Sequence, residues 1–309
     1  MMIRPVAVLI TAAALAAGTC HAQSYPSKPI RWIVPYTPGG ITDTVTRLVT
    51  QKLQTAWNQP ITVENRAGAN SLIGAELVAK SAPDGYTLLT VIAAHAANAT
   101  LYAGKMPFDA VKSFAAVSHV ASAPLILTAS NTLAAKDMRE LVAYAKANPG
   151  KLSFGSSGIG AAAHLTTEML KPVADIEMVH IPFKGTAGAL QALMSGDIQI
   201  LGDVPSSMMP HVRSGKIKAL ALFARERIPG AAEVPTILEA GGPPIESATW
   251  IMILAPAGTP ADIVNRVSHE IAKSVAATDL RDRLVQMGIQ PFGRTPEATA
   301  QFLNDEIAK

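Results

Sequence analysis

The sequence is poor in cysteine, in charge and in aromatic side chains. Its 309 residues include one cysteine, Cys20, and charged residues make up only 16% of the chain, with a formal net charge of +3. No block of lysines or arginines occurs, so nucleic acid and anionic membrane surfaces are not expected partners. A single cysteine also excludes an intramolecular disulfide and a cysteine-rich metal site. Hydrophobic residues make up 49% of the chain, which is enough for two domains or one large one.

The N-terminal apolar run has the pattern of a secretory signal peptide. Arg4 supplies a positive start, residues 6–18 form a short apolar segment, and Ala22 offers the small residue that a signal peptidase accepts. We therefore predict a signal peptide over residues 1–22, cleavage after Ala22 and a periplasmic protein. The alternative is a lipid anchor on Cys20, although the residues before it depart from the usual lipoprotein pattern.

Strand-like apolar runs alternate with helix-period segments along the rest of the chain. Val45, Leu48, Val49 and Leu53, for example, recur at the spacing of one buried helical stripe. Such alternation predicts an α/β fold with a largely parallel sheet. Helices are expected over residues 44–57, 71–80, 138–147, 160–171, 188–195, 260–276 and 280–287, and from Pro296 onward.

Two stretches share the order strand, glycine-rich loop, helix. "IRWIVPYTPGGITDTVTRLV" begins at Ile30 and "KLSFGSSGIGAAAHLTTEML" begins at Lys151. We call residues 35–42 the first glycine loop and residues 155–161 the second glycine loop. A helix N-terminus leaves N–H groups unpaired and carries a partial positive charge, which favours a carboxylate or phosphate. Two such ends can hold one anion, although a glycine after a strand is as often only a tight turn.

Neither glycine loop matches a nucleotide-binding or hydrolase fingerprint. Neither contains G-x-G-x-x-G, and G-x-x-x-x-G-K-[ST] is absent from the sequence. The nucleophile elbow G-x-S-x-G also fails, because Ile159 stands two residues after Ser157. A rival hypothesis, an exported serine hydrolase that uses Ser157 with His164 or His95, lacks an evident set of nucleophile, base and acid.

Other polar residues are candidates for the same anion site, each with a structural alternative. His95 follows a strand, where side chains often line α/β clefts, and His164 lies one turn into a helix, where packing is equally expected. Asp203 and Asp43 lie where strands lead into helices, and can either cap a helix or meet a ligand. Lys184 can pair with an anion, although lysine is usually exposed. The histidines show no metal-ligating spacing, so no metal or cofactor is expected.

The ordered motifs of the chain resemble the Bug family, the extracytoplasmic solute receptors of tripartite tricarboxylate transporters. The resemblance rests on segments such as "YPSKPIRWIVPYTPGGITD", "APDGYTLL", "ANPGKLSFGSSGIG", "VHIPFKGTAGALQALMSGDIQI" and "LAPAGTP". It implies an α/β fold like that of type II periplasmic binding proteins, with two α/β lobes of mixed sheets joined by a two-strand hinge. Lobe 1 is expected over residues 24–124 and 244–309, and lobe 2 over residues 125–243.

By the same resemblance, both glycine loops are expected to hold carboxylate groups of a ligand through backbone N–H groups, hydroxyls and water. The positions concerned are Tyr36, Thr37, Gly39, Gly40 and Thr42 in lobe 1, and Ser156, Ser157, Gly158 and Gly160 in lobe 2. Asp203 falls where family members carry an aspartate that meets an amine, hydroxyl or water of the ligand. Thr37 and Gly202 differ from the residues common in the family, which implies a roomier and more polar pocket on one side.

The resemblance implies a periplasmic receptor that captures a small carboxylate, closes around it and delivers it to the membrane subunits of a tripartite tricarboxylate transporter. A monomer without enzymatic activity is expected. A ligand-sensing receptor for a membrane signalling partner is a further alternative that the sequence leaves open. The ligand is equally open: a di-, tri- or aromatic carboxylate or an amino acid would each suit two helix ends. Relatives continue with a further helical stretch beyond the position of Lys309, so a slightly different packing of lobe 1 is expected there.

Overall fold

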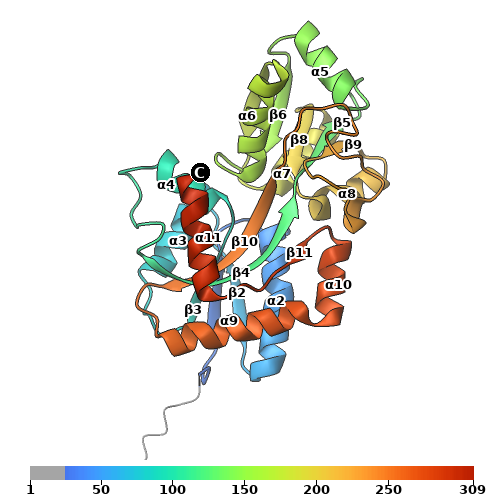
Figure 1. Cartoon of the computed structure of the whole chain (residues 1–309). Helices are drawn as coiled ribbons and strands as arrows, with labels where there is room; N and C mark the ends of the chain where they lie inside the picture. The colour runs from blue at the N-terminus through green and yellow to red at the C-terminus, as the bar shows by residue number, and fades with distance from the viewer. Residues whose placement is uncertain (1–24) are drawn as a thin grey trace, which may run out of the picture.

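The computed structural model describes residues 25–309, which form two α/β lobes connected by two strand crossings (Figure 1). The predicted signal peptide, with Cys20 and Ala22, lies outside the described residues. None of the helices over residues 25–309 is long and apolar enough to cross a bilayer.

Lobe 1 is built on a six-stranded sheet with the order β11-β4-β10-β3-β1-β2. Its strands are β1 (Ile30–Val34), β2 (Ile61–Asn65), β3 (Thr87–Val91), β4 (Phe114–Pro124), β10 (Ala248–Pro256) and β11 (Gln290–Pro291). β1 pairs in parallel with β2 and β3, whereas β10 pairs antiparallel with β3 and β4. The sheet is therefore mixed rather than largely parallel, because the chain returns from lobe 2 through β10.

Helices cover both faces of the lobe 1 sheet, because side chains of the central strand β1 alternate between two apolar layers. Trp32 packs in one layer with Val45 and Leu53 of α2, and Ile33 packs in the other with Val78 of α3. The helical elements of lobe 1 are α2 (Ile41–Trp57), η1 (Ala69–Ser71), α3 (Leu72–Ala79), α4 (Ala94–Leu101), α9 (Ala261–Ala276), α10 (Thr278–Gln286) and α11 (Pro296–Ala308).

Lobe 2 is built on a five-stranded sheet with the order β7-β6-β8-β5-β9. Its strands are β5 (Ile126–Ser130), β6 (Leu152–Ser156), β7 (Met178–Pro182), β8 (Ile200–Asp203) and β9 (Ile217–Leu222). Its helices are α5 (Met138–Ala147), α6 (Ala162–Ala174), α7 (Thr186–Ser195), α8 (Pro205–Arg213) and the 3₁₀ turn η2 (Pro229–Ala231). β6 is parallel to β7 and β8, and β5 is antiparallel to β8 and β9, so this sheet is mixed too.

Two helices were missing from the expected set. α4 has the sequence "AHAANATL", whose small and polar residues form no clear apolar stripe, and α8 contains Pro210 in its interior. Both follow a strand directly. Tertiary packing rather than periodicity supports α4, whereas α8 buries Pro205, Met208 and Met209 at helical spacing. All the helices that the sequence predicted are present, with ends shifted by a few residues.

Two antiparallel crossings form the hinge between the lobes. β4 leads into β5 at Leu125, and the chain returns to β10 at Ser247. Leu125 N donates to Ser247 O at 3.0 Å, and Ser247 N donates to Phe223 O at 3.0 Å. The predicted two-lobed fold with mixed sheets and a two-strand hinge is confirmed. The lobe boundaries, at residues 124/125 and 243/244, stay a prediction.

Candidate ligand-binding site

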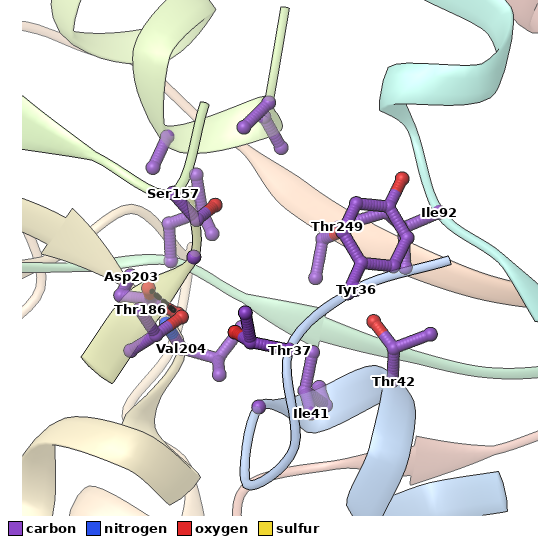
Figure 2. A pocket seen from close by; sticks show the side chains of 16 residues that line it. Tyr36, Thr37, Ile41, Thr42, Ile92, Ser157, Thr186, Asp203, Val204 and Thr249 are labelled. Carbon is purple, nitrogen blue, oxygen red and sulfur yellow. Dashed lines mark hydrogen bonds between the residues drawn. The ribbon is translucent and has the colours of Figure 1, made fainter. Parts of the chain in front are cut away.

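A cavity of about 40 Å³ lies between the lobes, beside the hinge (Figure 2). Its lining residues from lobe 1 and the hinge are Tyr36, Thr37, Gly40, Ile41, Thr42, Ile92, Leu125 and Thr249, and those from lobe 2 are Ser157, Ala161, Ala162, Ala163, Gly185, Thr186, Asp203 and Val204. No lysine, arginine or histidine is among these residues of the described chain. Positive potential at the cavity must therefore come from the backbone.

Four helix N-termini supply that potential. The N-cap residues of α2, α6, α7 and α8 are Gly40, Ala161, Gly185 and Val204, and all four line the cavity. No side chain of residues 25–309 caps any of the four, so the N–H groups of the first turns are free of side-chain acceptors. The sequence predicted the ends of α2 and α6. The structure adds α7, which begins at Thr186, and α8, which begins at Pro205.

The first glycine loop places Tyr36, Thr37, Gly40 and Thr42 on the cavity wall, but not Gly39. The N–H of Gly39 donates instead to Asp43 Oδ2 at 3.1 Å. Such an internal acceptor orients the loop and makes this N–H unavailable to a ligand.

Asp43 braces the first glycine loop and does not line the cavity. Its Oδ1 accepts from Arg47 Nε at 2.9 Å and from Asn65 Nδ2 at 3.0 Å. Burial raises the pKa of Asp43, but hydrogen bonds from Arg47, Asn65 and Gly39 outweigh burial and hold the pKa below its ordinary value. Asp43 is thus an ionised structural group at the start of α2.

Two hydroxyls on the cavity wall lack a hydrogen-bond partner. Over residues 25–309, four buried side-chain polar atoms are unpaired, and two of them, Tyr36 Oη and Thr249 Oγ1, belong to residues that line this cavity. Ser71 lies close to the Tyr36 hydroxyl without forming a hydrogen bond of normal geometry. Burial raises the pKa of Tyr36, so its hydroxyl stays neutral and can donate or accept. Buried hydroxyls without partners are rare and indicate water or ligand at the site.

Asp203 lies at the end of β8 and is the one carboxylate on the cavity wall. Its Oδ2 accepts from Thr186 Oγ1 at 2.7 Å and its Oδ1 from Val204 N at 2.7 Å, and Figure 2 shows the three residues together. Burial raises the pKa of Asp203, and the hydrogen bonds from Thr186 and Val204 oppose this effect only in part.

The second glycine loop departs from the expected arrangement, because only Ser157 of its four predicted residues lines the cavity. Ser156 is fully buried, and its Oγ donates to Gly158 O at 3.0 Å and accepts from Gly158 N at 3.2 Å. The same Oγ lies 2.7 Å from His180 Nε2. Ser156 and Gly158 therefore satisfy each other within the loop.

His164 provides a second internal hydrogen-bond acceptor for the second glycine loop. Gly160 N donates to His164 Nδ1 at 3.1 Å, and the rings of His164 and His180 pack with centroids 4.0 Å apart. Burial lowers the pKa of both histidines, and that of His180 falls to about 4 with a further contribution from His164. His164 and Gly160 thus organise the loop from behind, and neither lines the cavity.

His95 and Lys184 lie away from the cavity, contrary to expectation. His95 is buried on α4, with Nε2 2.9 Å from Ala110 O and its ring packed against Phe108 and Phe114. Burial lowers its pKa to about 4, which suits a neutral core histidine. Lys184 is exposed on the loop before Gly185 and is absent from the lining.

The chemistry of hydrolysis is not assembled at the cavity. Ser157 lines it, but His95 and His164 both bond elsewhere. Ser156, which is buried, and His180, which is half-buried, pair with each other and do not line the cavity. Residues 25–309 contain no group of three or more histidine, cysteine, aspartate or glutamate side chains placed to hold a metal ion.

Sequence reasoning missed the part of the lining that comes from α7 and the hinge. Gly185 and Thr186 follow the strand "EMVHIP", so they repeat the order strand, glycine, helix, and this signal could have found them. Thr249 carries no such signal, because it lies inside a continuous apolar strand. Only the packing of the hinge beside the cavity shows that Thr249 lines it and that its hydroxyl lacks a partner.

Comparison with known proteins gives one consistent result. A family model described as tripartite tricarboxylate transporter family receptor matches residues 45–309. The protein BugT of Bordetella pertussis is 33% identical over 309 residues, covering 98% of this chain and 93% of BugT.

Two solved structures, each with a bound acid, are similar over most of the chain. A protein of R. palustris with adipate has a TM-score of 0.89 and 31% identity, covering 92% of this chain and 95% of its own. MatC from Rhodopseudomonas palustris with bound malate has a TM-score of 0.85 and 32% identity, covering 92% of this chain and 98% of its own. These similarities match the two-lobed fold described above.

Proposed function

The chain belongs to the family of tripartite tricarboxylate transporter receptors, and on that premise we propose that it captures one small carboxylate between its lobes and delivers it to the membrane subunits of such a transporter. Receptors of this family are periplasmic solute-binding proteins that work with tripartite transporters, and they are not enzymes.

One observation carries the proposal: four uncapped helix N-termini converge on a cavity without any basic side chain. Free N–H groups and the helix dipoles of α2, α6, α7 and α8 favour a carboxylate there. Asp203 lies on the same wall and would repel a purely anionic ligand, unless the ligand presents a donor to it or Asp203 is protonated. The site therefore suits an acid that carries a hydroxyl or amine as well as a carboxylate.

Malate is the first probe, because it combines carboxylates with a hydroxyl and is the ligand of the similar protein MatC. Adipate, the ligand of the other solved relative, tests a longer acid without a hydroxyl. A thermal-shift panel of malate, succinate, adipate, aspartate, citrate and benzoate should show stabilisation, about 2.7 kcal/mol at 100 times the dissociation constant. If none of these acids raises the melting temperature, the receptor function proposed for this cavity is wrong.

The unpaired hydroxyl of Tyr36 gives a sharper test of the site. In Tyr36→Phe the ligand-free protein should be as stable as the parent or more so, because the variant removes a buried group without a partner. Affinity for malate should fall about two- to tenfold if a ligand oxygen pairs with this hydroxyl. Tyr144→Phe, at an exposed tyrosine on α5, is the matched control. Equal malate affinity in Tyr36→Phe and the control would remove Tyr36 from the site.

We also propose that the exported protein is a monomer with its N-terminus at Gln23, as the signal pattern in residues 1–22 implies. Mass spectrometry of the periplasmic protein checks the cleavage site, and a lipid on Cys20 would contradict it. We propose lobe boundaries at residues 124/125 and 243/244, with hinge motion between open and closed forms, as the two crossings suggest. Small-angle X-ray scattering should show a smaller radius of gyration when malate is bound.

A further inference from the structure

The segment between β2 and α3 contains a run of left-handed backbone. Ala69, Asn70 and Ser71 have φ values of 45°, 51° and 76°. Non-glycine residues rarely adopt this region, and such strain persists only where the surroundings hold it in place. Strained backbone of this kind concentrates at ligand clamps and switch regions, so its neighbours indicate what it does.

Asn98 on α4 holds the strained turn in its conformation. Asn98 Nδ2 donates to Asn70 O at 2.8 Å, and Asn70 Nδ2 donates to Asn98 Oδ1 at 2.7 Å. Asn98 is almost completely buried, with 1% of its surface exposed. The amide of Asn70 is therefore fixed relative to the core of lobe 1.

The fixed amide of Asn70 faces the second glycine loop of the other lobe. A Cβ atom added at Gly158 would lie 3.1 Å from Asn70 Oδ1, and one added at Gly160 would lie 3.4 Å from Asn70 Nδ2. The Cβ atom added at Gly160 would also lie 2.6 Å from Leu101 Cδ1 of α4. Only residues without a side chain allow lobe 1 to approach so closely.

These contacts give the two glycines a purpose that the ligand does not explain. Neither Gly158 nor Gly160 lines the cavity, and their N–H groups bond to Ser156 and His164 within lobe 2. The side of the loop that faces away from those acceptors meets Asn70 and Leu101.

We propose that Asn70 is a closure latch, a rigid side chain of lobe 1 that docks on Gly158 and Gly160 when the lobes close and so slows their reopening. Asn70 does not line the cavity, so it acts on ligand binding only through the position of the lobes. The proposal rests on the receptor function above in requiring that the lobes open and close, but it does not depend on the identity of the ligand.

Asn70→Gly tests the latch, because glycine keeps the left-handed backbone without strain and removes the docking amide together with its hydrogen bond to Asn98, while the bond from Asn98 to the Asn70 carbonyl remains. Asn58→Gly is the matched control: Asn58 has φ of 49° at the exposed C-terminus of α2, far from the other lobe in sequence and structure. Asn70→Gly should raise the dissociation rate constant of malate about threefold or more relative to the control, with little change in the association rate constant. Stopped-flow tryptophan fluorescence measures both constants.

Scattering from ligand-free protein gives a second measurement that needs no ligand. Asn70→Gly should have a larger radius of gyration than Asn58→Gly, because the closed form is less favoured. Equal dissociation rate constants of malate and equal radii of gyration in the two variants would overturn the latch. If the parent binds no acid of the panel, the receptor function fails, and the comparison of radii alone decides the latch.

A double substitution identifies the contact itself. Gly158→Ala should speed malate dissociation in the parent, since its Cβ would press on Asn70 Oδ1. In the Asn70→Gly background the same change should have a clearly smaller effect, because the opposing amide is gone. Additive effects of the two substitutions would show that Asn70 and Gly158 act separately and would contradict the latch.

Discussion

The first glycine loop places Tyr36, Thr37, Gly40, Ile41 and Thr42 on the cavity wall, whereas the second places only Ser157 and Ala161 there. Both loops follow a buried strand and lead into a helix, and both were expected to grip the ligand in the same way. The difference lies in where each loop finds its internal acceptors. In the first loop Asp43 takes up one N–H, that of Gly39, and in the second Ser156 and His164 take up two.

The comparison teaches that a glycine after a strand has two different uses in this fold. In the first loop the backbone is part of the cavity wall. In the second, Gly158 and Gly160 give the opposing lobe room to approach, and the start of α6 forms the wall in their place. The loop before α7 behaves like the first loop, because Gly185 and Thr186 both line the cavity.

The largest effect is expected at Gly185, which tests whether the α7 end is the true partner of the first loop. A Cβ there would collide with Thr37 Oγ1 of lobe 1, and the positive φ of 148° adds strain. Gly185→Ala should weaken malate binding about a hundredfold, ~2.7 kcal/mol, by isothermal titration calorimetry.

Gly150→Ala is the control for that substitution, because Gly150 also has a positive φ, of 69°, and nothing lies within 4 Å of an added Cβ. Circular dichroism should show both variants folded. If folded Gly185→Ala binds malate as tightly as the parent, the second glycine loop, rather than the end of α7, is the main partner of the first loop.

A smaller effect, about tenfold in selectivity, is expected from Asp203→Asn. Asparagine keeps the shape and can still pair with Thr186 and Val204, but it removes the negative charge. Binding of malate or aspartate should weaken relative to that of succinate, because a donor on the ligand loses its anionic acceptor while a plain diacid loses a repulsion. A uniform change across the three acids would show that Asp203 does not face the ligand.

The same variant carries a stability prediction with a defined sign. Burial raises the pKa of Asp203 in the folded state, so its favourable contribution is present below the ordinary pKa of 3.8 and is lost as the pH rises through the raised value. Asp203→Asn should therefore be at least as stable as the parent near pH 7, and its advantage should shrink toward pH 4. Melting temperatures over this range, without ligand, provide the measurement.

The stability that the hydrogen bonds of the second loop contribute should depend more weakly on pH. Since burial lowers the pKa of His180 from 6.5 to about 4, its contribution is present above about pH 6.5 and is lost as the pH falls toward 4. His164, Glu168 and Lys171 lie near the same ring: His164 and Lys171 lower the pKa of His180 further, and Glu168 raises it. His180→Gln, which can still bond to Ser156, should lose less melting temperature between pH 6.5 and 4 than the parent. Parallel curves would show that the pair does not titrate in this range.

The smallest effect is expected at Lys184, the one lysine among the predicted contacts. Lys184 is exposed and does not line the cavity, so Lys184→Ala should change malate affinity less than about twofold, even at low salt. A loss of tenfold or more would mean that a charged side chain, rather than helix ends, holds the carboxylate.

Much of the architecture could be predicted from local pattern. The apolar stripe of Val45, Val49 and Leu53 identified α2, and the repeated order of strand, loop and helix identified the class. α8 was lost because Pro210 argues against a helix in isolation, and α4 because it lacks a stripe. α4 packs against α11 and η1, and α8 packs against β5, β9 and η2, so both helices depend on distant segments that no window of sequence contains.

The site divides in the same way. Residues whose position follows from chain direction were predicted at the place where the cavity lies, since Tyr36, Thr37, Gly40 and Thr42 come directly after β1 at the start of α2. His95 could not be assigned, because its acceptor, Ala110 O, and its neighbour Phe114 lie beyond the helix that carries it. Thr249 could not be predicted because, in sequence, it resembles any other residue of a buried strand.

The sequence by itself determined the α/β class, the two glycine loops and the placing of a free helix end after each, because these depend on residues within a few positions of one another. The tertiary structure alone decided which N–H groups remain free, which glycines face the other lobe and which hydroxyls face the cavity. Those outcomes depend on pairs such as Asn70 with Gly158 and Thr37 with Gly185, which are far apart in the chain and meet only when the hinge brings the lobes together. Local geometry determines where the two loops lie in their lobes. Contact between the lobes determines which residues of each loop face the cavity and which face the opposing lobe.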